Sequence, residues 1–226
     1  MNRHAASLLS LPLAFLVGVA AAAVWPKEEV PAPAPQKQAE ALAPTRPEFG
    51  LVIPQKTWEP IFFESINERA QKAKLPTLRA PLPEGDIELR VWGGFGLTAL
   101  EGFRLRRAGS RWSATHLDTD YRDGRFIYFN RNLGEPKSGW EGAWNRLVSL
   151  GLMELPDAES AGCSTQVNDG FSYVVETNVD WVYRTYMYDN PDYSKCEEAR
   201  RMLSLAAAIA DEFGVEEFEP RDDTKR

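Results

Sequence analysis

Residues 140–213 decide the fold that the sequence predicts: WEGAWNRLVSLGLMELPDAESAGCSTQVNDGFSYVVETNVDWVYRTYMYDNPDYSKCEEARRMLSLAAAIADEF. The stretch begins with a helical pattern. Ser138 and Glu141 have the spacing of a capping box, and apolar residues at helical spacing follow them. We therefore expect a helix of about three turns from Trp140, ended by Gly151.

Two strands are expected in the middle of this stretch. Asn168-Asp169-Gly170 is a strong turn signal, and the alternation of side chains over residues 171–176 predicts a strand directly after it. Residues 181–188 carry aromatic side chains at both odd and even positions. This second strand is therefore expected to be central in a sheet and covered on both faces.

The last part of the stretch predicts a long helix from about Tyr193 to Phe213. Its apolar residues recur along one face and its charged residues along the other, as in a helix that packs on a core. Gly214 follows at the position typical of a helix C-terminus. The acidic residues 216–226 are expected to form a flexible tail.

The first half of the chain adds one more helix and more strands. Thr57 is expected to cap a helix whose apolar residues recur at helical spacing from Trp58 to Ala70, and Leu75-Pro76 is expected to end it. Alternation predicts a half-buried strand at residues 87–91, a hairpin over residues 103–116 and a further strand at residues 126–129. The fold class is therefore α+β, with an antiparallel sheet of about five strands and about three helices in a single domain over residues 51–215.

The N-terminal residues predict export from the cytoplasm. Residues 5–25 are uncharged and follow Arg3, and they are long enough to span a bilayer. They are also interrupted by Pro12, and Ala21-Ala22-Ala23 resembles a signal-peptide cleavage site. Residues 1–25 are therefore either an inner-membrane anchor or a cleaved signal peptide, and both place the domain in the periplasm or beyond it.

A segment rich in proline and alanine, residues 26–50, follows the apolar run and is expected to be a disordered spacer. A spacer is useful for holding a domain away from a membrane, which favours the anchor over the cleaved signal.

The two cysteines, Cys163 and Cys196, are expected to form a disulfide, because paired cysteines are usual in exported proteins. A catalytic thiol is the alternative. It would need a base, and His116 is the one histidine that follows the N-terminal segment.

Composition and motifs exclude several function classes. The chain has 226 residues, 43% of them hydrophobic, and a net charge of −7, which is typical of a globular protein and disfavours a nucleic-acid binder. It contains no GxSxG, HExxH, phosphate loop or metal-spaced His/Cys cluster. Gly93-Gly94-Phe95-Gly96 is interpreted as a turn or bulge. We predict no cofactor, no metal and no catalytic residue.

Two weaker signals stay open, one for serine catalysis and one for calcium binding. His116 falls on the inward side of its strand, and serine catalysis would need Asp118 or Asp120 to orient it. Asp118, Asp120 and Asp123-Gly124 also resemble part of a calcium loop, although turn chemistry explains them more simply.

A hydrolase with paired carboxylates is a further alternative, because such pairs leave no sequence motif. Glu176, Asp169 and Asp157 are its first candidates.

Two groups of residues are candidates for binding a partner. Arg184, Tyr186 and Tyr188 combine the residue types that dominate interaction hot spots, with a place in the core as the alternative for the tyrosines. Arg104 and Arg106 form a basic patch on the predicted hairpin, with an ordinary solvated strand face as the alternative.

The order of several core and turn residues is similar to that of a family of exported bacterial proteins of unknown function. The residues concerned are Trp92-Gly93, Phe95-Gly96-Leu97, Trp144, Leu147, Leu155-Pro156-Asp157, Asp169-Gly170, Tyr173, Val175-Glu176, Tyr183-Arg184, Tyr186 and Pro191. The resemblance implies a bacterial envelope setting, and it implies no activity, cofactor or catalytic residue.

The function that the sequence favours is a non-catalytic protein-interaction module, tethered in the periplasm and contacting another envelope protein. The membrane is contacted through the N-terminal segment, and nucleic acid is not an expected partner. A domain that binds a small ligand or glycan is the first alternative, and a carboxylate-based hydrolase is the second.

Overall fold

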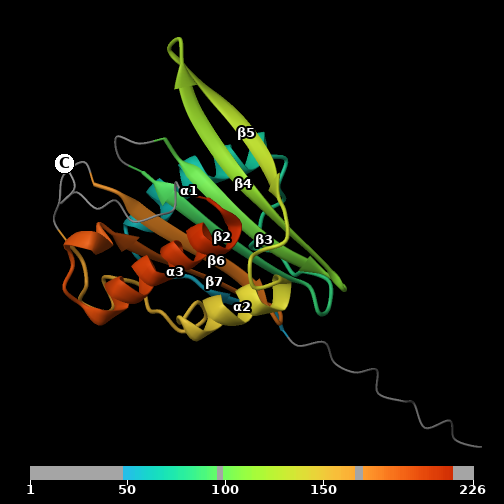
Figure 1. Ribbon diagram of the computed structural model, residues 1–226. Coiled ribbons are helices and arrows are strands. Elements are labelled where there is room, and N and C mark those ends of the chain that lie inside the picture. Colours follow the sequence, from blue (N-terminus) through green and yellow to red (C-terminus); the bar gives the residue numbers. More distant parts are fainter. Residues whose placement is uncertain (1–47, 96–98, 166–169, 216–226) are drawn as a thin grey trace, which may run out of the picture. The chain divides into compact units, whose positions relative to one another are not determined.

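The computed structural model of the protein describes residues 48–95, 99–165 and 170–215 (Figure 1). The predicted N-terminal segment, most of the spacer, the turn residues Asn168 and Asp169 and the C-terminal tail lie outside these ranges. Within them, the elements in chain order are β1 (Gly50–Val52), α1 (Trp58–Lys72), β2 (Ile87–Gly94), β3 (Glu101–Ala108), β4 (Arg111–Arg122), β5 (Arg125–Leu133), α2 (Trp140–Ser149), β6 (Ser172–Val179), β7 (Val182–Asp189), the 3₁₀ helix η1 (Pro191–Tyr193) and α3 (Glu197–Phe213).

One mixed sheet contains all the described strands, in the order β1-β7-β6-β2-β3-β4-β5. The α+β class is therefore confirmed, but the sheet has seven strands and not about five. It is also not purely antiparallel, because β1 pairs with β7 in parallel. Its partner strand lies more than a hundred residues away in the sequence, so no local pattern predicts the three-residue strand β1.

Helices cover both faces of the sheet (Figure 1). On one face, α2 and α3 pack on Leu89 and Val91 of β2 and on apolar residues of the neighbouring strands. On the other face, α1 packs on Trp92 of β2, Leu117 of β4 and Val174 of β6. No helix of the described ranges is long and apolar enough to cross a membrane.

Strand β2 is buried along its whole length, so the prediction of a half-buried strand is wrong. Its charged residues Glu88 and Arg90 are buried on the side of the sheet that carries α1. Glu88 accepts hydrogen bonds from Arg90 Nε at 2.8 Å and from Arg104 Nε and Nη2 at 2.8 and 2.9 Å. Burial alone would raise the pKa of Glu88, but the hydrogen bond from Arg104 and the charges of Arg90 and Arg104 outweigh it and hold the pKa below its usual value.

The ends of the helices only partly follow the predictions. Gly139, and not Ser138, caps α2, because Ser138 donates from its backbone N and its Oγ to Glu212 Oε2 of α3, both at 2.9 Å. The predicted capping box is therefore absent. Gly214 ends α3 in the left-handed conformation (φ 65°), which confirms its predicted role. α3 begins at Glu197, four residues later than predicted, because η1 occupies the preceding turn.

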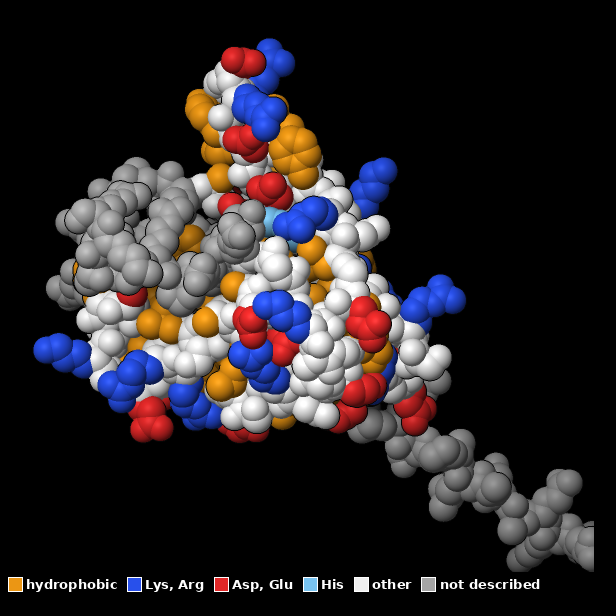
Figure 2. Space-filling view, in the orientation of Figure 1, with side chains coloured by type: hydrophobic (Ala, Val, Ile, Leu, Met, Phe, Trp, Pro, Cys, Tyr) orange, Lys and Arg blue, Asp and Glu red, His pale blue; other side chains and the backbone are white. Residues whose placement is uncertain are grey.

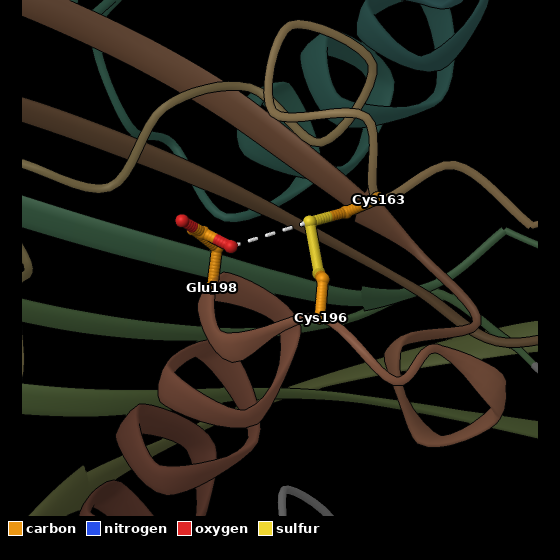
Figure 3. Close-up of side chains that lie close together, drawn as sticks. All are labelled: Cys163, Cys196 and Glu198. Atoms are coloured by element: carbon orange, nitrogen blue, oxygen red, sulfur yellow. Dashed lines mark hydrogen bonds between the residues drawn. A yellow bond between two sulfur atoms is a disulfide. The ribbon is translucent and has the colours of Figure 1, made fainter.

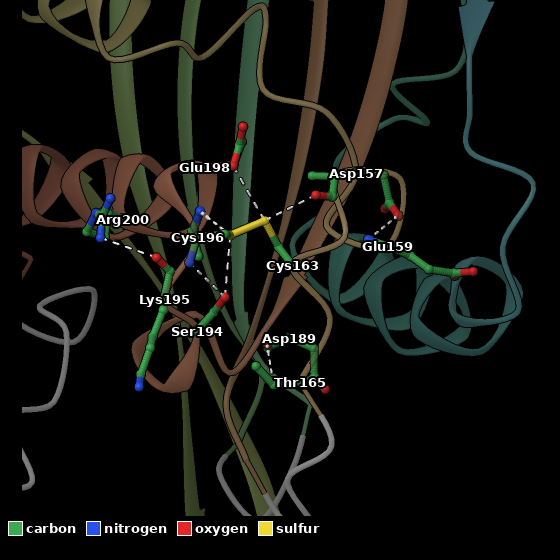
Figure 4. Close-up of a disulfide and its surroundings, with 12 residues drawn as sticks. Asp157, Glu159, Cys163, Thr165, Asp189, Ser194, Lys195, Cys196, Glu198 and Arg200 are labelled. Atoms are coloured by element: carbon green, nitrogen blue, oxygen red, sulfur yellow. Dashed lines mark hydrogen bonds between the residues drawn. A yellow bond between two sulfur atoms is a disulfide. The ribbon is translucent and has the colours of Figure 1, made fainter.

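The predicted disulfide is present and joins Cys163, in the loop after α2, to Cys196, the N-cap of α3 (Figures 3 and 4). The Cα atoms lie 5.8 Å apart, and Cys196 Sγ also accepts a hydrogen bond from Ala199 N at 3.3 Å. Just beyond Cys163, Thr165 Oγ1 donates to Asp189 O of β7 at 2.9 Å (Figure 4). The alternative of a free catalytic thiol is excluded in this state, since both sulfurs are bonded.

Replacing both cysteines with serine is expected to lower the free energy of unfolding by about 3–4 kcal/mol, because the bridge closes a loop with a sequence separation of 33 residues. Serine keeps a capping oxygen at position 196, so the double alanine variant should be destabilised by about 1 kcal/mol more. Urea unfolding of the oxidised wild type and both variants measures these differences. A double serine variant as stable as the oxidised wild type would contradict the prediction.

Candidate functional site

The residues predicted as the main contact surface lie in the core. Tyr186 and Tyr188 are each 1% exposed, and the Tyr186 hydroxyl donates to Leu152 O at 3.0 Å. Burial raises the pKa of both tyrosines. The guanidinium of Arg184 donates to the backbone oxygens of Met153 and Leu155. Both tyrosines are therefore core residues, as the alternative interpretation predicted. Arg184 is bound to the loop after α2.

The other predicted binding group, Arg104 and Arg106, is also engaged within the fold. Arg104 is bound to Glu88, and Arg106 Nη2 lies 3.4 Å from Asp86 Oδ2. These arginines are thus neither on an ordinary solvated face nor free to bind an acidic partner. The sequence pattern did not predict this, because the carboxylates that pair with these arginines lie elsewhere in the chain. Glu88 is on the adjacent strand β2, and Asp86 directly precedes that strand.

His116 is fully buried, as its inward position predicted, but its neighbours differ from those of a catalytic triad. Its Nε2 lies 3.5 Å from Glu101 Oε2 and its Nδ1 lies 3.3 Å from Arg131 Nη2. Asp120 instead accepts a hydrogen bond from Arg122 Nε at 2.6 Å.

Of the described carboxylates that the sequence suggested for hydrolysis, Glu176 is the more deeply buried. It accepts hydrogen bonds from Trp92 Nε1 at 2.7 Å and from the Tyr183 hydroxyl at 2.9 Å. It borders a hollow of about 140 Å³ between α1 and the sheet, beside Arg79 and Arg90. Burial raises the pKa of Glu176, against the opposing charge of Arg90 and the hydrogen bonds from Trp92 and Tyr183.

The second carboxyl that a glycosidase mechanism needs is not among the described residues that line this hollow. Asp157 instead accepts from Trp58 Nε1 at 3.1 Å and Met187 N at 3.2 Å, and Asp169 lies outside the described residues. The arrangement around Glu176 can hold a proton on a buried carboxyl, but it offers no partner for hydrolysis.

The raised pKa of Glu176 predicts a pH dependence of stability. Above the unfolded-state pKa near 4.5, the unfolded chain releases this proton more readily than the folded protein, so folding becomes less favourable as the pH rises. Glu176→Gln removes the ionisation and is matched in size. The stability of the wild type relative to this variant should fall between pH 4.5 and 7.5, by about 1.4 kcal/mol for each unit of the pKa shift.

Urea unfolding of both proteins across this pH range tests the sign. An increase in the relative stability of the wild type with pH would mean that Arg90 and the hydrogen bonds outweigh burial, and it would contradict the assignment.

Figure 3 shows the one cluster of described residues whose atoms have metal-ligand spacing, formed by Cys163, Cys196 and Glu198. Both sulfurs are joined in the disulfide, so neither can act as a thiolate ligand. Glu198 Oε2 lies 3.6 Å from Cys163 Sγ, which is a packing contact because a disulfide sulfur carries no hydrogen. The described residues therefore provide no metal centre here.

The exposed part of the β4–β5 hairpin is the feature that the sequence did not reveal. Residues 118–129, which we call the arm, extend beyond the rest of the described sheet (Figure 1). Asp123 and Gly124 have positive φ values of 51° and 75° and make its turn, as predicted. β5 pairs with β4 on one side and ends the sheet on the other.

Large apolar side chains are exposed on both faces of the arm. Figure 2 shows them as a group on its projecting end. Tyr121 and Phe126 pair across the hairpin with ring centroids 5.2 Å apart and are 62% and 55% exposed. Ile127 and Phe129 are 36% and 41% exposed on alternate positions of β5, with Phe129 pointing to the opposite face from Phe126.

A groove of about 340 Å³ lies between α1 and the arm, and we call it the arm groove. Its apolar lining consists of Ile61, Phe62, Phe95, Leu100, Phe126 and Tyr128. Phe62 and Phe95 stack with centroids 4.4 Å apart. Arg69 of α1 joins the helix to the arm by donating to Asp118 O at 3.0 Å, Phe129 O at 2.9 Å and Thr119 Oγ1 at 3.2 Å.

The chain matches no protein-family model, and a comparison with curated proteins found no significant similarity. The arm and the arm groove are therefore the features from which a function can be argued.

Proposed function

We propose that the protein is a non-catalytic protein-interaction module of the bacterial envelope, and that the arm is its contact surface. In this proposal, residues 1–25 hold the domain at the periplasmic side of the inner membrane, or direct its export before they are cleaved. The disulfide supports an oxidising compartment, because such bonds persist outside the cytoplasm. The resemblance to exported bacterial proteins that the sequence suggests implies the same setting.

The observation that carries the proposal is the exposure of apolar side chains on an edge strand. Water solvates Tyr121, Phe126, Ile127 and Phe129 poorly, and each would gain free energy by burial against a partner. Natural proteins usually protect a long edge strand, since its backbone groups are ready to pair with another chain.

The geometry favours a partner that adds an extended segment to β5. A strand beside β5 would receive hydrogen bonds from its backbone edge, while apolar side chains on both faces of the arm would contact residues flanking that segment. The opposite edge of the sheet is less suited to this role, because β1 has only three residues.

Co-purification of the full-length protein from gently solubilised membranes tests the proposal. The wild type should recover a stoichiometric partner, and the Phe126→Ser/Phe129→Ser variant should recover at least about tenfold less, because aromatic residues at interface centres contribute most of the binding free energy. Leu51→Ser is the matched control, since it removes an apolar side chain that is 56% exposed on the opposite edge strand.

Equal recovery by the wild type and the arm variant would place the contact elsewhere. Equal loss with Leu51→Ser would indicate non-specific adhesion of exposed apolar residues. Either result would overturn the assignment of the arm.

A further inference from the structure

Two cations lie beside the ring of Tyr128 at the edge of the arm groove. Arg69 Cζ is 5.2 Å and Lys72 Nζ is 6.0 Å from the ring centroid. Neither side chain has a carboxylate within 4 Å among the described residues, whereas Arg90, which is as buried as Arg69, is paired with Glu88. The ring attracts both cations but does not neutralise them.

Arg69 is 2% exposed, so its charge is held away from water. Its hydrogen bonds go to backbone oxygens and neutral side chains, and its Nη1 has no hydrogen-bond partner in the described part of the chain. Burial lowers its pKa, against the charges of Tyr128 and Asp118. A buried cation without a paired anion is costly, and an anion placed nearby would reduce that cost.

The charge around the groove is positive on the side of Lys72. An adjoining hollow of about 620 Å³ shares Phe126 and Tyr128 with the groove and is also lined by Lys72, Arg122, Arg125 and Asp123. Glu68, one helical turn before Lys72 on α1, is the one carboxylate among the described residues that line the groove itself.

The groove also has the size and lining of a small-molecule site. Its volume of about 340 Å³ lies in the range of such sites, and its walls are mainly aromatic and aliphatic. An occupant that fits both the walls and the charge has an apolar body and an anionic group.

We propose that the arm groove binds an amphiphilic organic anion, with its apolar body against Phe62, Phe95 and Phe126 and its anionic group beside Tyr128, where Arg69 and Lys72 meet. This site goes beyond the protein contact proposed above, because it uses the α1 face of the arm and does not require an edge-strand partner. The two proposals can therefore fail separately.

The test compares two fluorescent probes that share one ring system, 8-anilinonaphthalene-1-sulfonate and the uncharged N-phenyl-1-naphthylamine. The full-length protein should bind the sulfonate at least about tenfold more tightly, because a charge-assisted contact adds to the same apolar burial. Octanoate should displace the sulfonate, and 1-octanol at the same concentration should not.

Four variants locate the site. Lys72→Met should weaken sulfonate binding about tenfold and leave the uncharged probe unchanged, and Arg69→Met should do the same. Phe126→Ser should weaken both probes. Arg111→Met is the matched control, because it removes an exposed arginine at the far end of β4 and should change neither affinity.

Lys72 is exposed, and among the described residues it joins no other element by an ion pair. Its variant therefore keeps the test valid if Arg69→Met loosens the arm. The proposal is overturned if the two probes bind with equal affinity, if Lys72→Met leaves sulfonate binding intact, or if Arg111→Met weakens it as much as Lys72→Met does.

Discussion

The assembly of the sheet depends on the buried charge of Glu88. Glu88 lies on the central strand β2, where it is inaccessible to water, and it is bound by Arg90 of its own strand and Arg104 of β3. Removing one partner from a buried pair of this kind typically costs about 3–5 kcal/mol. The pairing thus holds β2 and β3 in one register, with Arg104 directly opposite Arg90.

The same layer of charge continues across the sheet. Glu176 of β6 lies opposite Arg90, and Arg90 also donates to Pro76 O in the loop after α1 at 2.9 Å. Because α1 covers these groups, each has to find its partner inside the protein. The polar layer therefore contributes to a defined packing of α1 on the sheet, and α1 in turn forms one wall of the arm groove.

The folded body uses most of its reactive groups internally, and this bears on function. Tyr186, Glu176 and Arg104 are bound within the fold, and the cysteines are joined. The arm is different, because it extends beyond the rest of the sheet (Figure 1) and its apolar side chains are exposed (Figure 2). The exposed edge strand is the feature on which the proposed binding role rests.

Local sequence patterns correctly predicted the elements that depend on interactions between residues close in sequence. The periodicity of α3, its end at Gly214 and the turn at Asp123-Gly124 were correct for this reason. The pairing of Cys163 with Cys196 was also correct, because the chain offers no other cysteine. The alternation of Glu88 and Arg90 predicted a solvated face, and this was wrong because α1 covers that face from another part of the chain.

The candidate site could not be predicted for a related reason. The pattern at residues 126–129 predicted a strand, but which strand ends the sheet depends on the strand order, which no local pattern determines. Arg69 lies within the helix that the sequence predicts, and only the packing of α1 against the arm shows that it is buried. The signal that was missed is the number of aromatic residues in β5, which is higher than expected for a strand with only one buried face.

The most direct test of the central claim, that the arm is the contact surface, is site-specific photo-crosslinking in intact cells. A photoreactive phenylalanine analogue would replace Phe126 on the arm or, as a control, Tyr193, an aromatic residue of η1 that is 58% exposed. If the arm is the contact surface, position 126 should give a discrete crosslinked species of defined mass, and position 193 should give none of that mass. Equal crosslinking from both positions, or a discrete species from position 193 alone, would contradict this claim.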